Sequence, residues 1–331
     1  MKKIILFIVL LTTLISCKNK SYNYFEGETQ GTTYHITFEE SDINITAKEI
    51  DSVIAQFSKV FSTYDSASII SRINYNDSTV EIGDNFKYLL KVSEEVYKQS
   101  DKLFDITIAP IVNAWGFGFK TGKHVDSLLI DSLLQYVGYN KIRLSGNKII
   151  KQNPNIMLDG NAIAQGYSVD IVAKYLECKN VKNYLVEIGG ELKAVGVNEN
   201  GNCWRVGIDK PIENSDAENR ELQTIIAINN LSLATSGNYR KFFVENGVKY
   251  AHTINPKTGY PVKNDLLSVT VLCKECIYAD AYATTFMVMG YEQSKTFVES
   301  RPDLEAYFIY TDNDNQIQEY YTSNFKKMKV E

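Results

Sequence analysis

Two kinds of hydrophobic spacing divide this 331-residue chain into an earlier and a later part. In the earlier part apolar residues return every three to four positions, as in the run from Ile50 to Phe61, and this spacing is typical of amphipathic helices. The later part consists mainly of short runs rich in β-branched and aromatic residues, such as Thr224 to Ile228, between turn-forming residues. No internal repeat or low-complexity linker separates the parts. The pattern therefore predicts an α+β fold in which helices pack on mixed sheets within a single large domain.

The same spacing predicts individual elements. Residues 18–22 are expected to form a short tether, and the sequences around 246–247 and 312–315 are expected to turn between strands. The expected helices cover residues 50–61, 86–97, 108–115, 127–137, 279–289 and 291–300, of which 279–289 is apolar enough to be buried. The expected strands cover residues 33–38, 142–144, 148–150, 184–188, 192–197, 204–208, 224–228, 242–244 and 267–272.

The first seventeen residues have the features of an export signal. Lys2 and Lys3 form a short positive segment, and the apolar run that follows is too short to span a bilayer. Leu14-Ile15-Ser16-Cys17 resembles a bacterial lipobox, in which the cysteine is acylated and becomes the first mature residue; an ordinary export signal or short anchor is the alternative. We expect residues 1–17 to be a lipoprotein signal peptide that ends at Cys17, and residues 18–331 to be an exported, tethered domain.

Charge and cysteine content narrow the choice of partners. The net charge of -5 argues against nucleic acid, because binding to phosphate backbones normally needs a basic face. Cys273 and Cys276 form a single C-x-x-C at the end of an apolar strand, with no second pair and no neighbouring histidine. Packing at the end of the strand is therefore favoured over a zinc site or a redox pair.

A candidate cation site lies in the apolar helix expected at 279–289. The chain has three histidines and no P-loop, dinucleotide fingerprint, nucleophile elbow or H-E-x-x-H, so a cation here would be a hard one held by oxygen. Asp280 and Thr284 are four residues apart and share one face of the helix. Together they can hold Mg²⁺ and leave positions for phosphate and water. A helix cap and an ordinary buried threonine are the alternative reading.

Three loops carry further candidates. The small residues around Asp159 precede a helix, whose N-terminus favours phosphate; capping that helix is the alternative role of Asp159. Residues 234–239 read as a hydroxyl-rich turn suited to phosphate oxygens, and residues 187–191 as a tight turn between strands. His252 lies in a polar loop that Pro256 and Gly259 define; a lone histidine is more often structural, but the ordered loop favours a functional role.

These segments together resemble the ApbE family, the FAD:protein FMN transferases. Eight motifs occur in the family's order over the whole mature chain, and eight in order are far more specific than one. The motifs are residues 29–32, 61–65 with 71–74, 104–107 leading into 110–118, the Asp159 loop, 189–191, 235–237, the His252 loop and 279–281.

The resemblance implies a site. It implies that the backbone carbonyl of Ala162, together with Asp280 and Thr284, holds Mg²⁺. The resemblance also implies that His252 and Asp280 are catalytic residues. Either His252 or a carboxylate could take the proton of the attacking hydroxyl. By the same resemblance the FAD site is lined by Gln30, Tyr64, Leu103, Phe104, Asp105, Asp159, Gln165, Ser236, His252 and Thr253.

Some positions depart from the family pattern. Gln30 replaces the usual methionine, Gln165 replaces a common lysine, and Asn238 and Asn255 stand where aspartate is frequent. Residues 160–162 replace Leu-Gly-Gly. The lysine common in the family at position 165 would neutralise phosphate charge. Its replacement makes tight binding of FAD less certain, but it does not argue against FAD as the ligand. Asp280 and Thr284 are unaffected.

The activity implied is Mg²⁺-dependent transfer of FMN from FAD to a threonine hydroxyl of an acceptor flavoprotein, with release of AMP. The acceptors expected from the family are subunits of membrane redox complexes, and the lipid anchor would face the periplasm. One alternative is a FAD pyrophosphatase that gives FMN and AMP, with water in place of the acceptor. Another is a flavin-binding lipoprotein without catalysis, which would leave Asp280 and Thr284 without a purpose.

Overall fold

A long antiparallel sheet forms the centre of the protein. The structure, a computed structural model, describes residues 21–118, 125–212, 221–238, 242–245, 248–263 and 265–330. Within them the main sheet has eight strands in the order β1-β2-β5-β6-β9-β12-β13-β14, and each neighbouring pair is antiparallel. These strands are β1 (Tyr22–Thr29), β2 (Thr32–Glu39), β5 (Tyr184–Ile188), β6 (Glu191–Val195), β9 (Leu231–Gly237), β12 (Leu266–Cys273), β13 (Glu305–Thr311) and β14 (Ile317–Tyr321).

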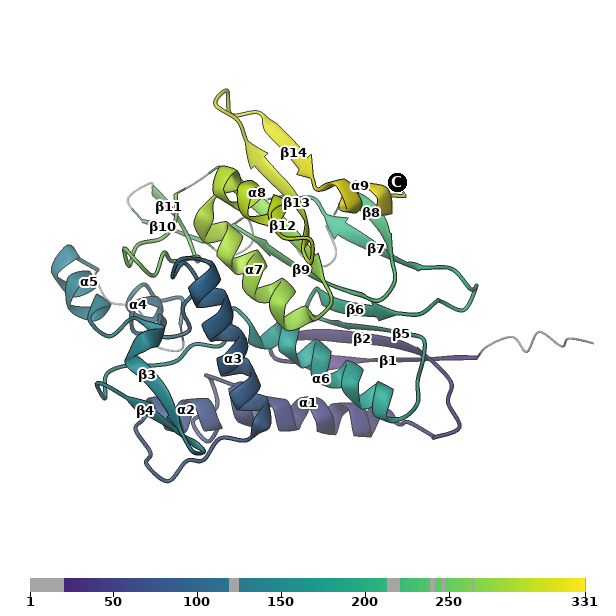
Figure 1. Ribbon diagram of the computed structural model, residues 1–331, viewed down its shortest axis with the longest axis horizontal. Helices are drawn as coiled ribbons and strands as arrows, with labels where there is room; N and C mark the ends of the chain where they lie inside the picture. The colour runs from purple at the N-terminus through teal and green to yellow at the C-terminus, as the bar shows by residue number, and fades with distance from the viewer. Residues whose placement is uncertain are drawn as a thin grey trace, which may run out of the picture.

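Helices cover one face of this sheet, as Figure 1 shows. The helix α7 (Cys276–Met289) packs against β9 and β12 and also against α6 (Ala164–Cys178), while α1 (Ala47–Phe61) packs on α6. The amphipathic pattern of α1 is confirmed, because its buried residues are Ile50, Ile54, Phe57 and Phe61. The remaining helices are α2 (Ile69–Asn74), α3 (Asp84–Gln99), α4 (Ala109–Ala114), α5 (Ser127–Leu134), α8 (Tyr291–Glu299) and α9 (Ser323–Met328), with a short 3-10 turn at Tyr139–Lys141.

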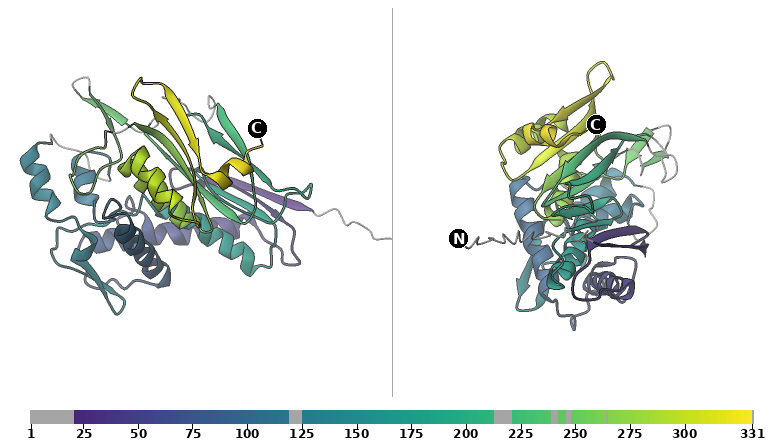
Figure 2. Two further views of the ribbon diagram at one scale, coloured as in Figure 1. Left: turned by 45° about the horizontal axis from the view of Figure 1, so that its top comes forward. Right: turned by 90° about the vertical axis from the view of Figure 1, so that its right-hand side faces the viewer.

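Three two-stranded sheets lie outside the main sheet. Figure 2 shows the hairpin of Ile142–Ser145 and Lys148–Lys151 on the side of α2 and α3. The pair Trp204–Asp209 and Leu222–Ile228 instead packs against the main sheet, because its buried residues share one hydrophobic cluster with Leu192, Leu233 and Tyr307. The predicted turn at Asn246–Gly247 lies outside the described residues. The pairs are β3 (Ile142–Ser145) with β4 (Lys148–Lys151), β7 (Trp204–Asp209) with β8 (Leu222–Ile228), and β10 (Phe242–Glu245) with β11 (Val248–Ala251).

The α+β class is confirmed, and the differences from the prediction are local. Tyr22 belongs to β1 rather than to a tether, because its backbone pairs with Glu39. The strand expected at 192–197 ends at Val195, since Gly196 has φ +67° and breaks the extended conformation. Residues 234–237 form the end of β9 instead of a turn, because they pair with β12. Cys273 and Cys276 are buried and free at the junction of β12 and α7, which confirms packing at the strand end.

No helix in the described ranges combines the length and the apolar character needed to cross a membrane. Cys17 and the rest of the predicted signal peptide precede residue 21 and lie outside the described residues.

Candidate functional site

The residues predicted to bind FAD lie around one cavity of about 740 Å³. This volume is within the range of small-molecule sites, roughly 300–1,000 Å³. Ala162 and Thr284 of the predicted metal site line it as well. The cavity is therefore assembled from the β1–β2 turn, the segment after α1, the segments before α4 and α6, the end of β9, the loop after β11 and helix α7. Its predicted lining residues are Gln30, Tyr64, Leu103, Phe104, Asp105, Asp159, Gln165, Ser236, His252 and Thr253.

Aromatic side chains supply much of the cavity wall. Phe104 is 2% exposed and belongs to the core, whereas Tyr64 is 74% exposed and keeps its ring free at the cavity. An exposed aromatic ring at a cavity can stack on a flat ligand. Phe57, Phe61 and Phe117 also line the cavity. The sequence places Phe61 and Phe117 within family motifs but does not predict any of the three as a FAD contact. Phe57 and Phe61 were placed by their helical spacing in the core, and spacing alone does not reveal that the core has an opening here.

Asp280 lies within α7, one helical turn before the cavity-lining Thr284. Its side chain is 5% exposed, and its Oδ2 accepts a hydrogen bond from the backbone N–H of Gly166 at 2.9 Å. Burial raises the pKa of Asp280 from 3.8 to about 7, and the bond from Gly166 acts in the opposite direction. The position inside α7, beyond its first turn, shows that the alternative reading of Asp280 as a helix cap was wrong.

The oxygen atoms near Asp280 fit a hard cation. In a regular helix the N–H of Gly166 would donate to the carbonyl of Ala162, but it donates to Asp280, and the described residues show no backbone hydrogen bond to that carbonyl. The hydroxyl of Thr285 donates to Ala281, whereas within the described ranges the Thr284 hydroxyl has no such bond. A carboxylate, a hydroxyl and a carbonyl suit Mg²⁺. Among the described residues no group of three or more His, Cys, Asp or Glu side chains is placed to hold a metal ion, so phosphate and water oxygens would be suitable further ligands here.

The carboxylates of Asp105 and Asp159 differ in how much of their hydrogen-bonding capacity is used. Asp105 accepts from the backbone and hydroxyl of Thr107 with one oxygen and from the backbone of Tyr139 with the other. Asp105 therefore holds the cavity wall together. Asp159 accepts from the backbone of Asn161 through Oδ1, at 2.9 Å, which leaves Oδ2 available to a ligand. Burial raises the pKa of both groups.

Asp159 does not cap α6, contrary to the alternative reading of the sequence. The N-cap of α6 is Ile163, which makes no side-chain capping bond. The local bond from Asn161 is a turn within the loop, and the backbone N–H of Asp159 donates to Ile106 at 2.7 Å. The loop is thereby tied to the segment that carries Asp105.

Gln165 is fixed by the turn between β5 and β6. Its Nε2 donates to the carbonyl of Ile188 at 3.2 Å, and a Cβ at Gly189 would lie 1.8 Å from that nitrogen. Gly189 and Gly190 both have positive φ, so the predicted tight turn is confirmed. The lack of a side chain at Gly189 allows Gln165 to lie against the turn while it lines the cavity.

Ser236, His252 and Thr253 also line the cavity. Ser236 lies in β9 opposite Val269 of β12, so its place is set by sheet pairing, and the turn that the sequence predicted here was wrong. Thr253 donates to Oδ1 of Asn238 at 3.3 Å. The ring of His252 meets the ring of Phe117 edge to face, with centroids 6.4 Å apart. The imidazole is therefore at the cavity surface and within the set of residues that the sequence indicated.

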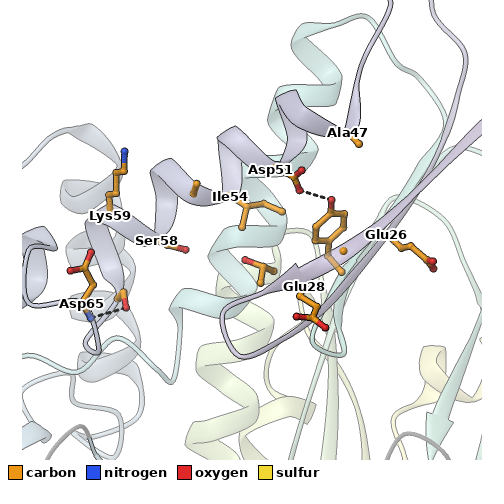
Figure 3. Close-up of a pocket in the computed structure, with 13 residues that line it drawn as sticks. Glu26, Glu28, Ala47, Asp51, Ile54, Ser58, Lys59 and Asp65 are labelled. Atoms are coloured by element: carbon orange, nitrogen blue, oxygen red, sulfur yellow. Dashed lines mark hydrogen bonds between the residues drawn. The ribbon is translucent and has the colours of Figure 1, made fainter.

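A second cavity, of about 680 Å³, lies between α1 and the β1–β2 hairpin (Figure 3). Tyr34 lines this cavity, and its hydroxyl donates to Oδ1 of Asp51 at 2.6 Å. Its charged lining residues are Glu26, Glu28, Asp51, Asp65 and Lys59. This excess of carboxylates repels phosphate, so the first cavity is the better site for a diphosphate ligand.

Comparison with known proteins agrees with this geometry. Residues 30–308 match the ApbE family. A FAD:protein FMN transferase from Haemophilus influenzae is 35% identical over 346 residues, which covers 99% of each chain. Another from Vibrio cholerae is 34% identical over 325 residues, with 96% of each chain covered.

Solved structures give the same result. The flavin transferase ApbE from Vibrio cholerae superposes with a TM-score of 0.82 at 33% identity, covering 93% of this chain and 99% of that chain. The flavinyl transferase ApbE from Pseudomonas stutzeri, in its apo form, gives a TM-score of 0.81 at 29% identity, with 93% and 97% covered. On its fold, its cavity and these similarities, the chain belongs to the ApbE family.

Proposed function

We propose that this protein transfers FMN from FAD to a hydroxyl group of an acceptor protein and releases AMP. The observation that carries the proposal is the convergence of ten predicted FAD-binding residues on one cavity, with a buried carboxylate on α7 one turn from the cavity-lining Thr284. Relatives that align over almost the whole chain are named FAD:protein FMN transferases, which supports the same reaction.

In the proposed reaction the hydroxyl oxygen of a threonine in the acceptor attacks the phosphorus of the FMN half of FAD. A new P–O bond forms, the bond to the bridging oxygen breaks, and AMP leaves with the electron pair. The hydroxyl proton passes to a base, for which His252 at the cavity surface and the free oxygen of Asp159 are the candidates. The chain itself needs no nucleophile, since the acceptor provides it.

The cavity residues would bind both halves of FAD and shield them from bulk water. The exposed ring of Tyr64 is suited to stacking on a flat ring of the ligand, and the buried aromatic wall excludes solvent. Mg²⁺ held by Asp280, Thr284 and the Ala162 carbonyl would neutralise charge on the diphosphate. An acceptor threonine would reach the phosphorus from an exposed loop of its own protein.

We also propose that the protein acts outside the cytoplasm. The lipobox sequence that ends at Cys17 supports a lipid anchor, with the domain facing the periplasm. Acceptors would then be flavoprotein subunits of membrane redox complexes, whose exposed loops the tethered domain can reach.

The test is incubation of purified protein with FAD, Mg²⁺ and a candidate acceptor, followed by denaturing electrophoresis scored for flavin fluorescence. Covalent fluorescence on the acceptor that is lost when its threonine is replaced by valine is the expected result. Release of FMN and AMP without labelling of any acceptor would favour a pyrophosphatase. Bound, unaltered FAD would favour a protein that carries flavin without catalysis.

A further inference from the structure

Helix α7 has no apolar face that could fix its rotation. Buried residues occur on every side of it, among them the small Ala279, Ala281 and Ala283. A helix that is apolar all round gains similar burial in several rotations about its axis. Close packing of its large side chains constrains α7, and polar contacts add a further constraint on which side carries Asp280 and Thr284 toward the cavity.

Two hydrogen bonds from α6 make these contacts. The N–H of Gly166 donates to Asp280, and one turn further along α6 the Oδ2 of Asp170 accepts from the N–H of Ile277 at 2.9 Å. Gly166 and Asp170 are four residues apart and share one face of α6. The hydroxyls of Tyr278 and Tyr282 bond to α3. The two bonds from α6 add fixed points near the start of α7 and thereby hold its rotation and its position along α6.

Asp170 also replaces a missing cap. The N-cap residue of α7, Glu275, makes no side-chain capping bond, and its carboxylate instead accepts from the hydroxyl of Tyr88. The first N–H groups of a helix need acceptors, and a negative charge is favourable near them. Asp170 supplies that charge from the neighbouring helix.

The charge of Asp170 is balanced by Lys193 of β6. Its Nζ lies 3.2 Å from Oδ1 of Asp170, and the two side chains are 16% and 10% exposed. Lys193 occupies one oxygen and Ile277 the other, so the carboxylate is held between the sheet and α7.

We infer that Asp170, which lines neither cavity, is a positioning residue that sets the rotation of α7 and thereby aims Asp280 and Thr284 at the cavity. The inference rests on the proposed function for the meaning of the Asp280 and Thr284 pair. The inference adds a residue that the sequence analysis did not single out. The sequence feature that could have indicated it is a carboxylate between Val169 and Val172, which are buried in α6.

The test uses Mn²⁺ as the probe, with its binding to the purified protein followed by electron paramagnetic resonance. In Asp170→Asn the amide keeps one acceptor, but its NH₂ group faces either Lys193 or the N–H of Ile277. We expect Mn²⁺ binding to weaken about tenfold, in the range of losses typical for residues that orient metal ligands. FAD affinity in chelator is expected to stay within about twofold, since Asp170 does not reach the cavity.

A double variant separates positioning from stability. Asp170→Asn with Lys193→Met removes the unpaired buried ammonium, so thermal stability should recover while Mn²⁺ binding stays weak. Lys179→Met is the matched control, because Lys179 pairs with Glu49 of α1 at 3.1 Å and should leave Mn²⁺ binding unchanged.

The outcomes decide the inference. Normal Mn²⁺ binding by folded Asp170→Asn, or recovery of both stability and Mn²⁺ binding in the double variant, would overturn it. If the single variant does not fold, the double variant provides the test: weak Mn²⁺ binding supports the inference, and normal Mn²⁺ binding overturns it. The proposed function is tested separately, by whether the wild type labels an acceptor in Mg²⁺. If it does, and the variants bind Mn²⁺ normally, the proposed function stands but Asp170 does not have this role.

Discussion

Gly166 and Asp280 are joined by a hydrogen bond that takes the place of a normal helical one. The N–H of Gly166 donates to Oδ2 of Asp280 at 2.9 Å, and no backbone hydrogen bond to the carbonyl of Ala162 is found among the described residues. The same contact orients the carboxylate and leaves a carbonyl available to a cation. It depends on close approach of α6 and α7.

Substitution of Gly166 by alanine should disrupt this approach. An added Cβ would lie 2.4 Å from the carbonyl oxygen of Cys276 and 2.7 Å from Cβ of Asp280. We expect Gly166→Ala to lower the free energy of unfolding by about 1–3 kcal/mol, as overpacking does, and to reduce transfer in the fraction that folds. Chemical denaturation and the transfer assay measure the two effects. Gly83→Ala is the control, because no atom lies within 4 Å of its added Cβ; equal behaviour of the two variants would contradict the argument.

Removal of the charge of Asp280 should abolish most of the activity. Asp280→Asn keeps the size of the side chain but not the charge that holds a hard cation, so transfer is expected to fall by about two orders of magnitude or more. Thr284→Val should have a smaller effect, since a neutral hydroxyl is the weaker ligand, and Thr284→Ser should retain much of the activity. The measurement is FMN transfer at saturating FAD by variants shown to be folded. Near-normal transfer by Asp280→Asn would exclude the proposed metal site.

Burial of Asp280 predicts a pH dependence of stability in chelator. Its pKa is raised from 3.8 to about 7 in the folded state, so between these values the folded protein keeps a proton that the unfolded chain has lost. The contribution of Asp280 is therefore most favourable below about pH 4 and declines as the pH rises to about 7. Each pKa unit between the two states is worth about 1.4 kcal/mol.

The comparison for this pH dependence is Asp280→Asn, because an amide at this position does not titrate. Between about pH 4 and pH 7, the free energy of unfolding of the variant in chelator should rise relative to that of the wild type. Above about pH 7 the difference between the two proteins should stay constant. Denaturant titrations at several pH values measure the difference. Parallel curves for the two proteins across this range would show that the carboxyl does not titrate as described.

The cavity should prefer FAD to riboflavin. The predicted lining residues come from both halves of the chain, and the diphosphate and adenosine of FAD give more contacts than riboflavin has. Calorimetric titration in Mg²⁺ is expected to show at least about tenfold tighter binding of FAD. Tyr64→Ala should weaken both ligands if Tyr64 stacks on the flavin and only FAD if it stacks on the adenine. Equal affinity for the two ligands in the wild type would count against FAD as the donor.

Cys17→Ser tests the proposed lipid anchor. Without the thiol no acyl chain can be attached, so the exported domain should appear in the soluble fraction. Fractionation of cells that express each form, with detection by antibody, measures this. Catalysis by the purified variant should be unchanged. Retention of Cys17→Ser in the membrane would exclude the lipobox interpretation.

Local spacing in the sequence determined most elements of this fold. The helical spacing of Ile50, Ile54, Phe57 and Phe61 correctly predicted α1 and its buried side, and the apolar stretch at 279–289 correctly predicted the buried helix α7. The turn at 312–315 between β13 and β14 also follows from local composition. These features depend on burial and backbone preferences within a few residues, and both are written in the local sequence.

Local reasoning failed where a distant partner decides the conformation. Residues 234–237 are small and hydroxyl-rich, which favours a turn, yet they form a strand because β12 pairs with them and Thr235 bonds to Thr270 at 2.8 Å between the hydroxyls. Asp159 has the type and position of a helix cap, yet its oxygen is used in the loop. Sheet pairing and loop contacts outweigh weak local preferences.

The family motifs in the sequence predicted which residues form the site, and the tertiary structure decided where those residues lie and which of their atoms are already hydrogen-bonded. Only packing brings Gln30, Asp159 and His252 to one cavity from segments far apart in the chain. Only the packed chain shows that Asp105 has both oxygens engaged, and that the carbonyl of Ala162 accepts no backbone hydrogen bond among the described residues. The physical reason is that a side chain's chemistry depends on which of its atoms remain unpaired and how far it is removed from water, and neither is fixed until distant elements have packed.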